Sequence, residues 1–558
     1  MITQPHFHSK THEVFNGVPG VPNANWYDLD IPLQEALKRE GGKWGEGQVK
    51  SYGNLVGRTI YQLGFLANEN PPTFFSHDMI GHRIDEVRYI PAYHEILNIA
   101  ISNNLHGLPW HKSKKGAHVV RGALNYLHYQ AEAGTACPIT MTFAAVPLIR
   151  KVDSIAKKWL PKILSTQYDP KNAPIEEKVG AMIGMALTEK QGGSDVKANT
   201  TRAHPVGQAG MGQEYEIIGH KWFCSAPLSD AFLVTAKAPE GLSCFLVPRW
   251  RPDGTHNAFY IQQLKNKCGD KSNALAEVEL WGAYGQMVGE PGKGLTTILE
   301  MIMLTRFDCI VASSALMRQA LFQALHFVKH RSCFGKKLIM QPLMQNVLCD
   351  LALEVEGALA LSFRLARALD YCQDEHAASL LRIGTAIGKY WCCKRATLIV
   401  NEAQECLGGL GYIEASIMPR LYRQAPLNSI WEGCGNIQCL DVLRALKNQP
   451  QTLEIFWQEI LKTRGQNKDF DIALAKLQKR MPEISWDPFL GRQLVSEMAL
   501  LWQSALLLEY APSEVSNAFC QSRLSETRGY SFGSLPKGTA VNTILERALK
   551  GALGNAIY

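Results

Sequence analysis

The sequence predicts a mainly helical protein with a β domain in the middle of the chain. Residues 1–179 have a mostly helical pattern with polar interruptions, and apolar residues recur at three- and four-residue steps after about residue 293. Between these parts, short runs of β-branched and aromatic residues alternate with turn residues. The predicted order is therefore an N-terminal helical domain, an antiparallel β domain, a four-helix bundle and an extra C-terminal helical domain.

The chain is long enough for several domains. Its 558 residues exceed one ordinary compact domain. Pro71-Pro72 and the loop 169–172 interrupt the first helical part, because the residue before a proline avoids the helical conformation. We expect an N-terminal helical domain at 1–179, a β domain at 180–292, a four-helix bundle at 293–449 and a C-terminal helical extension at 450–558.

Five short runs predict the β domain. They follow one another closely between turn residues, a spacing that favours an antiparallel sheet or a small barrel. The runs are Glu214–Ile218, Ala231–Lys237, Leu242–Pro248, Ala258–Leu264 and Ala276–Trp281.

The helical period returns in the third part and continues to the end of the chain. Apolar residues from Leu316 to Val328 lie on one helix face, and 343–370, 377–407 and the segment after Gly435 are stretches of the same kind. Four helices joined by short loops are typical of an up-down bundle. The helices expected in the extension are Leu453–Lys462, Phe470–Met481, Leu490–Tyr510 and Val541–Lys550.

Composition excludes several classes of protein. Hydrophobic residues make up 46% and charged residues 20%, which argues against disorder. The 14 cysteines are scattered without a C-x-x-C pair, which is typical of reduced cytosolic thiols and argues against a metal site. The first eight residues lack a signal-peptide pattern, and no apolar run reaches about 18 residues, so we expect a cytoplasmic protein without a membrane span. The net charge of +7 permits an anionic partner without requiring one.

Two motifs in the β domain suggest a bulky ligand with a phosphate. In Met185–Asp195, paired glycines let the backbone approach a ligand closely, and Ser194 can donate to a phosphate. In 219–225, Phe223 can pack on a flat ring while Ser225 bonds the edge of the ring. A polar turn and a strand with a core phenylalanine are the structural alternatives.

Three motifs in the helical bundle carry further chemistry. Arg331 ends an apolar helix, where it can stabilise the helix dipole or reach a pyrophosphate as a forked donor. The run Gly408–Gly411 follows a helix rather than a strand, which excludes a Rossmann fingerprint. Glu432, between Trp431 and Gly433, suits a general base in a partly dry pocket, although a helix cap or a salt bridge would also explain it.

In this order the motifs resemble the acyl-CoA dehydrogenase superfamily. The resemblance implies the fold given above, with FAD bound between the domains. The matching segments are Thr188-Glu189 with Gly193-Ser194-Asp195, then Phe223-Cys224-Ser225, Arg331 with Phe334-Gly335 and Gln341, Gly408–Gly411, and Glu432-Gly433.

Several strings and the helical extension are similar to one branch of this superfamily, the AidB-like flavoproteins of the alkylation response. The strings are Thr11–Asn16, Cys137–Phe143, Thr188–Asp195, Thr305–Asp308, Pro419–Arg423 and Asn428–Gly433.

The resemblance assigns a site. Glu432 would be the catalytic base. In the family the segment with Arg331, Phe334 and Gln341 contacts the FAD of a neighbouring subunit, which implies a homotetramer built as a dimer of dimers. The residues expected to bind FAD are Met185, Thr188, Gly193, Ser194, Phe223, Cys224, Ser225, Arg331, Phe334, Gln341, Ile430, Trp431, Gly433, Cys434, Gly435 and Asn436.

Four residues depart from the general family pattern. Lys190 stands for a proline, Phe223 for a tryptophan, Ser225 for a threonine and Glu405 for a glutamine. These changes are compatible with FAD binding. They put in question whether the pocket takes the usual acyl-CoA substrates.

The AidB-like resemblance implies an FAD-containing protein of the adaptive response to DNA alkylation. It would bind double-stranded DNA without strong sequence preference and protect it or inactivate alkylating agents, with at most weak acyl-CoA dehydrogenase activity. Its small-molecule partner would be an acyl-CoA or a small alkylating agent. The alternative is a genuine short- or branched-chain acyl-CoA dehydrogenase that uses Glu432 as its base.

DNA contact is expected mainly through the C-terminal extension. From residue 451 on, 12 Lys+Arg stand against 11 Asp+Glu, so a phosphate-binding face must come from clustering rather than from total charge. Each candidate also fits a solvated helix face. The candidates are Lys462, Arg464, Lys468, Lys476, Lys479 and Arg480.

Overall fold

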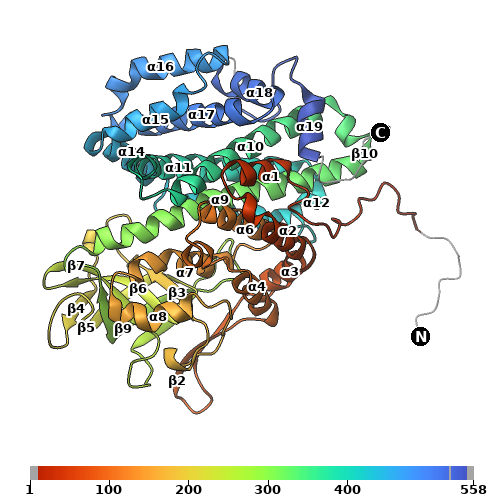
Figure 1. The fold of residues 1–558 in the computed structure, drawn as a ribbon. Coiled ribbons are helices and arrows are strands. Elements are labelled where there is room, and N and C mark those ends of the chain that lie inside the picture. Colours follow the sequence, from red (N-terminus) through yellow and green to blue (C-terminus); the bar gives the residue numbers. More distant parts are fainter. Residues whose placement is uncertain (1–10, 527–528, 550–558) are drawn as a thin grey trace, which may run out of the picture.

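The structure is a computed structural model that describes residues 11–526 and 529–549. Residues 1–8, on which the expectation of no leader rests, and Lys550, the end of the last predicted helix, lie outside the described residues. Figure 1 shows the N-terminal helices and the β domain below a helical bundle, with the C-terminal helices stacked on the other side of the bundle.

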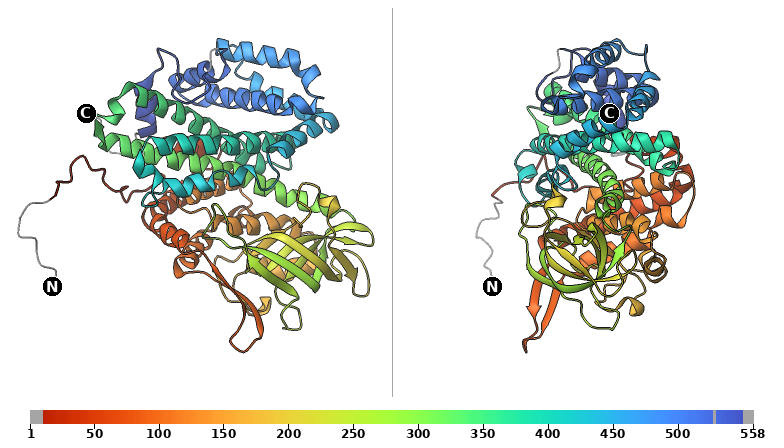
Figure 2. Two further views of the ribbon diagram at one scale, coloured as in Figure 1. Left: turned by 180° about the vertical axis from the view of Figure 1, so that it is seen from behind. Right: turned by 90° about the vertical axis from the view of Figure 1, so that its left-hand side faces the viewer.

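The N-terminal part is helical, as predicted, but it also contains a β-hairpin. Strands β1 (Thr73–His77) and β2 (Arg83–Arg88) pair antiparallel and start directly after Pro71-Pro72. Figure 2 shows this hairpin projecting from the body of the molecule. The helices are α1 (Ile31–Arg39), α2 (Glu46–Leu55), α3 (Tyr61–Glu69), α4 (Pro91–Ser102), α5 (Leu108–His111), α6 (Ala117–Ala131), α7 (Ala136–Ile149) and α8 (Asp153–Ile163).

The β domain is a seven-stranded sheet, in which six strands follow one path and the seventh, β8, pairs with β9 at its side. All five predicted runs lie in strands: β5 (Glu214–Ser225), β6 (Ala231–Ala238), β7 (Gly241–Pro248), β8 (Phe259–Leu264) and β9 (Leu275–Val288). The strand order is β3-β6-β4-β5-β9-β7, and β7 also pairs with β6, which curls the sheet towards a barrel.

The sequence predicts an antiparallel sheet, but the observed sheet also contains parallel pairs. Two short strands, β3 (Ile183–Ala186) and β4 (Arg202–Pro205), pair parallel to β6. Each has only four residues, too few to show an alternating pattern in the sequence.

The predicted four-helix bundle is confirmed. It consists of α9 (Gly294–His330), α10 (Pro342–Asp370), α11 (Glu375–Glu405) and α14 (Gly435–Asn448). A small hairpin, β10 (Ser332–Cys333) with β11 (Lys336–Lys337), joins α9 to α10, and the short helices α12 (Gly409–Tyr412) and α13 (Met418–Gln424) lie between α11 and α14. With 37 residues, α9 is about 55 Å long and runs from the β domain to this hairpin (Figure 1).

The C-terminal extension packs on the bundle. Its helices are α15 (Gln451–Leu461), α16 (Lys468–Ile484), α17 (Gly491–Tyr510), α18 (Ser513–Leu524) and α19 (Val541–Leu549). Gly384 on α11 leaves room for the Trp502 ring of α17, which a β-carbon would approach to 2.5 Å. One continuous core joins the N-terminal helices, the bundle and the extension and takes in part of the sheet, such as Leu233 and Leu246. The rest of the β domain has a separate core. None of the described helices is long and apolar enough to cross a bilayer.

Candidate active site

Glu432 lies on a short loop that is held from within the bundle. Its φ is +57°, a left-handed conformation that costs free energy for a residue with a side chain. The buried ammonium of Lys389 donates to three carbonyl oxygens of this loop, those of Asn428 (3.1 Å), Trp431 (2.6 Å) and Gly433 (2.8 Å). The backbone around Glu432 is therefore fixed by a cation buried on α11.

Two further side chains hold the carbonyl of Glu432 itself. Arg306 Nε of α9 donates to this oxygen at 2.8 Å, and Gln438 Nε2 of α14 donates to it at 3.2 Å. Arg306 is in turn paired with Asp441 at 3.0 Å. Three helices of the bundle thus set the position of one residue.

The carboxylate of Glu432 is held by one oxygen only. Thr305 Oγ1 donates to Oε2 at 2.9 Å, whereas Oε1 accepts no hydrogen bond from any described residue. Burial raises the pKa of this carboxyl group above its usual value, and the Thr305 bond with the charges of Lys389 and Arg306 partly opposes the rise. Within the described chain Glu432 is neither a helix cap nor part of an ion pair, so its free oxygen is suited to take a proton.

Ser225, at the end of β5, faces the same region. Its Oγ lies 3.4 Å from Cys137 Sγ on α7 and accepts from Asn273 Nδ2 at 3.2 Å. Burial, and then the negative charges of Asp270 and Glu432, raise the pKa of the Cys137 thiol to about 12. Glu432 is thus close enough for its charge to act on Cys137, which in turn contacts Ser225.

The loop that follows β3 has a buried, tightly held part around Glu189 and an exposed part around Ser194. Glu189 is fully buried and accepts from Lys221 Nζ at 2.9 Å, and these interactions lower its pKa to about 2 although burial alone would raise it. A β-carbon at Gly193 would meet Thr188 Oγ1 at 2.4 Å, so this position requires glycine. Ser194 is exposed, and its hydroxyl has no hydrogen-bond partner in the part of the chain that the structure describes.

Phe223 presents its ring outside the sheet. Trp222 and Phe223 form a bulge in the pairing of β5 with β9, and 45% of Phe223 is exposed. Lys265 Nζ lies 3.6 Å from the centre of the Trp222 ring and 4.8 Å from that of Phe223. Cys224 points into the core of the β domain, so only its backbone can reach a ligand on this face.

Three predicted residues lie apart from these groups. Arg331, Phe334 and Gln341 are at the far end of α9, beside β10 and β11 (Figure 1). Arg331 donates to the carbonyl of Asn16 at 3.0 Å, Gln341 donates to that of Cys333 at 3.1 Å, and the Phe334 side chain is 93% exposed. One copy of the chain does not bring them to Ser225.

The remaining predicted residues lie in β3 and in the segment from Ile430 to the start of α14. Met185 is in β3, Ile430 and Cys434 are exposed around Glu432, and Gly435 is the first residue of α14. Trp431 Nε1 donates to Asn428 Oδ1 at 3.1 Å, which orients its ring. The Asn436 side chain is engaged with the C-terminal extension, because its Oδ1 accepts from Arg492 Nε of α17 at 2.8 Å.

The six candidate DNA contacts lie at the turn after α15 and along α16. Three of them are paired: Lys462 with Glu459 (3.0 Å), Arg480 with Glu497 (2.9 Å) and Lys476 with Glu526. Arg464, Lys468 and Lys479 are exposed and form no ion pair with a described residue.

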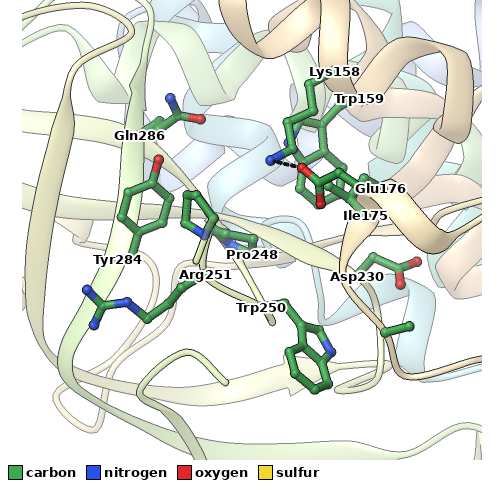
Figure 3. Close-up of a pocket in the computed structure, with 12 residues that line it drawn as sticks. Lys158, Trp159, Ile175, Glu176, Asp230, Pro248, Trp250, Arg251, Tyr284 and Gln286 are labelled. Atoms are coloured by element: carbon green, nitrogen blue, oxygen red, sulfur yellow. Dashed lines mark ion pairs between the residues drawn. The ribbon is translucent and has the colours of Figure 1, made fainter. Parts of the chain in front are cut away.

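A shallow cleft elsewhere in the molecule does not belong to this site. Figure 3 shows it between α8 and the β domain, lined by Trp159, Trp250 and Tyr284 among others. Its charged groups are paired within the chain, for example Lys158 with Glu176 and Asp230 with Lys178. The cleft is a packed seam between two parts of the fold.

Sequence reasoning gave no role to the residues that support Glu432 and Ser225. Thr305, Arg306 and Cys137 occur in strings that carry the resemblance, and Lys389 is the one charged residue in the run Ile383–Cys393 of α11. A lysine within such an uncharged run is the pattern that indicates a buried polar role. No sequence pattern indicates a role for Asn273.

Known protein families match successive segments of the chain in the same domain order. Residues 16–170 match the family described as the adaptive response protein AidB N-terminal domain. Residues 184–282 and 292–447 match the middle and C-terminal domains of acyl-CoA dehydrogenases. The chain is 44% identical over 525 residues to the putative acyl-CoA dehydrogenase AidB of Escherichia coli, covering 94% of this chain and 96% of that protein.

Solved structures are similar over most of the chain. The crystal structure of Caenorhabditis elegans ACDH-11 in complex with C11-CoA superposes with a TM-score of 0.84 at 25% identity, covering 99% of this chain and 95% of that one. An acyl-CoA dehydrogenase from Bacillus anthracis, complexed with FAD, has the same fold at 18% identity, with a TM-score of 0.67 and coverage of 91% and 87%.

Proposed function

Because the chain belongs to the acyl-CoA dehydrogenase family, in its AidB-like branch, we propose that it is an FAD-containing protein of the response to DNA alkylation. It holds double-stranded DNA without strong sequence preference and keeps weak acyl-CoA dehydrogenase chemistry. The observation that carries the flavin part is the loop of Glu432, whose backbone is fixed by Lys389 and Arg306 while one carboxylate oxygen stays free.

The residues around Ser225 and Glu432 are suited to bind FAD. Gly192 at φ +121° and Gly408 at φ +58° have open space where a β-carbon would stand, so the backbone can approach a bulky cofactor at both places. Ser194 offers a free hydroxyl to a phosphate, and the exposed Phe223 ring with the nearby Ser225 hydroxyl suits a flat ring and its edge. When bound, FAD supplies a hydride acceptor.

The chain itself supplies the base and holds its surroundings. Glu432 Oε1 would take the α-proton of an acyl thioester, while Thr305 keeps Oε2 in place. The raised pKa of Glu432 brings it nearer to neutral pH, where a general base works best. Asn273 and Cys137 hold the Ser225 hydroxyl, so a substrate lying between Ser225 and Glu432 would meet fixed groups.

The DNA part of the proposal is carried by the cations of the C-terminal extension. Arg464, Lys468 and Lys479 are exposed without a described carboxylate partner, and Lys462 stands beside them at the turn after α15. Such groups favour phosphate over bases, which supports binding that is salt-sensitive and blind to sequence. All fourteen cysteines are free thiols, which supports the reducing cytoplasm as its location.

A pair of measurements on one sample tests the proposal. The purified yellow protein is mixed with a short acyl-CoA without oxygen while flavin absorbance is recorded, and duplex DNA is titrated by fluorescence anisotropy. We expect slow bleaching that falls on the order of 100-fold or more in Glu432→Gln, with DNA affinity unchanged. Glu216→Gln, the same change on the exposed face of β5, should leave both unchanged.

Each part of the proposal has its own contrary result. Bleaching that survives in Glu432→Gln removes this residue as the base, and the absence of any DNA binding by the wild-type chain removes the DNA part. Rapid bleaching without DNA binding would instead identify a genuine acyl-CoA dehydrogenase. Protection of DNA from an alkylating agent that is equal in Glu432→Gln and wild type would assign protection to DNA holding alone.

A further inference from the structure

The loop Lys112–Lys115 carries cations that have no carboxylate partner in the described chain. Lys112, Lys114 and Lys115 are all exposed, and none lies within ion-pair distance of a described carboxylate. The sequence suggests only a solvated loop here, because a basic run of this length is usually a solvated surface. The structure gives these side chains a defined place.

The loop is held in shape by aromatic rings. Trp44 Nε1 donates to the carbonyl of Lys115 at 3.0 Å, and Lys114 Nζ lies 4.6 Å from the centre of the Trp44 ring. Lys115 Nζ lies 4.9 Å from the centre of the Tyr371 ring, which follows the last residue of α10. The loop is therefore tied to the C-terminal end of α10, and the ammonium groups remain accessible.

The same end of α10 is bound to the end of α15, and the turn that follows α15 carries Lys462 and Arg464, two of the DNA candidates. Arg364 binds Glu459 of α15 through two bonds of 2.8 and 2.7 Å, and Lys462 binds the same carboxylate at 3.0 Å. Seven residues of helix, about 10 Å, separate Arg364 from Tyr371. Lys462 and Lys115 thus flank one end of one helix although they are far apart in the sequence.

We propose that the loop Lys112–Lys115 and the turn Lys462–Arg464 form one binding face for the phosphate backbone of duplex DNA. This inference rests on the proposed DNA binding and extends it to the N-terminal domain. Both clusters fit within one turn of a duplex, about 34 Å, along which each strand presents a phosphate about every 3.4 Å. Of the acidic groups near the face, Glu459, Glu40 and Asp370 are engaged by Arg364, by Arg39 and by the backbone of α6, and Asp374 caps α11. Glu375 is exposed and forms no ion pair with a described residue.

The test is a salt series of DNA affinity with the full-length, FAD-loaded protein. The variant Lys112→Gln/Lys114→Gln/Lys115→Gln keeps much of the packing against Trp44 and Tyr371 but removes three charges. Its slope of log affinity against log salt should be smaller than that of the wild type by roughly 2 to 3, since each lost phosphate contact removes about 0.9. Lys462→Gln/Arg464→Gln should lower the slope further in the combined variant.

A matched control removes the same charge elsewhere. Lys157, Arg202 and Lys237 are exposed on α8 and the β domain, so Lys157→Gln/Arg202→Gln/Lys237→Gln should keep the wild-type slope. An unchanged slope in the loop variant with normal wild-type binding overturns this inference alone. No wild-type binding overturns it together with the proposed DNA function.

Amine labelling of the unmodified protein gives a second measurement that does not depend on the folding of a variant. Duplex DNA should protect Lys112, Lys114 and Lys115 from acetylation, while Lys157 and Lys237 stay reactive. Equal labelling with and without DNA contradicts the proposal. Protection by vesicles of anionic phospholipid but not by DNA would assign the face to a membrane surface instead.

Discussion

At the scale of single residues, the hydroxyl of Thr305 controls the acidity of Glu432. Its bond to Oε2 stabilises the ionised carboxylate and lowers a pKa that burial raises. A base must be ionised to take a proton, so the rate of flavin bleaching should rise with pH through the pKa of Glu432.

Thr305→Val should therefore move this pH profile to higher pH, by roughly 1 to 2 units for one lost hydrogen bond to a charged group. The measurement is the anaerobic bleaching rate as a function of pH in both proteins. Thr296→Val, an exposed change on the same helix, should leave the profile in place. A midpoint that stays put or moves to lower pH would contradict this account of Glu432.

Lys389 is the second residue whose removal the structure makes informative. Its ammonium is buried and donates to three carbonyl oxygens of the Glu432 loop. Lys389→Met leaves those of Asn428 and Trp431 without a donor, whereas Gln438 Nε2 still donates to that of Gly433 at 2.8 Å. At roughly 1 kcal/mol or more for each of these two groups, we expect a loss of about 2 kcal/mol or more in the free energy of unfolding. Thermal melting measures it.

The neighbouring helix surface supplies the control for this change. Lys394→Met, one turn further along α11 and exposed, should melt as the wild type does. Equal melting of Lys389→Met and wild type would mean that the loop does not depend on the buried ammonium.

The motifs around the site could be found in the sequence because each is local. Glu432 with its flanking glycine and tryptophan, and Ser194 with its paired glycines, are contiguous strings. Their supports are not: Thr305 is 127 positions from Glu432, and Asn273 is 48 from Ser225. Only the packing of helices and sheet brings them together, so no local pattern could have indicated them.

At the scale of elements, the C-terminal extension is fastened to α10 by ion pairs as well as by packing. Glu354 of α10 accepts from Arg523 of α18 at 2.7 Å and from Arg395 of α11 at 3.0 Å, and Arg523 also binds Asp350. Burial alone would raise the pKa of Glu354, but the two guanidinium groups outweigh it and lower the pKa to about 2.

The lowered pKa of Glu354 predicts how the stability of the protein changes in acid. A carboxyl group with a lowered folded-state pKa contributes stability above its unfolded pKa, near 4.5, and loses it as pH falls towards 2. Glu354→Gln should therefore lower the free energy of unfolding at pH 7 by about 3 kcal/mol, because Arg395 loses its carboxylate partner and Arg523 keeps only Asp350. The difference should shrink towards pH 2.

An exposed pair of the same extension provides the comparison. Glu526→Gln removes the surface partner of Lys476 and should leave the melting temperature almost unchanged at both pH values. Equal destabilisation by Glu354→Gln and Glu526→Gln would show that the buried pairs do not fasten the extension.

Long periodic elements were predictable, and short or polar ones were not. The helices α9, α10 and α11 have many turns over which the apolar period repeats. The four-residue strands β3 and β4, the hairpin after Pro71-Pro72, and α18 with its serines, asparagine and cysteine show no such repeat. Their positions come from pairing and packing with distant segments.

At the scale of the whole molecule, the candidate FAD site is divided along α9. Ser225 ends β5, and Glu432 is held by Thr305 and Arg306 of α9, whereas Arg331 with Phe334 lies at the far end of this helix, about 38 Å further along it. If all of these residues bind FAD, as the family resemblance implies, a second copy of the chain must supply Arg331 and Phe334. Assembly and cofactor retention should then fail together.

Phe334→Ser should weaken both, because the side chain is 93% exposed in a single copy and so has contacts to lose only in an assembly. The measurements are the mass of the particle by light scattering and the flavin retained after gel filtration at falling protein concentration. Phe489→Ser, on an equally exposed ring of the C-terminal extension, is the matched control and should change neither. Full retention of FAD by a Phe334→Ser monomer would show that one chain completes the site alone, and the homotetramer would then have no part in holding the cofactor.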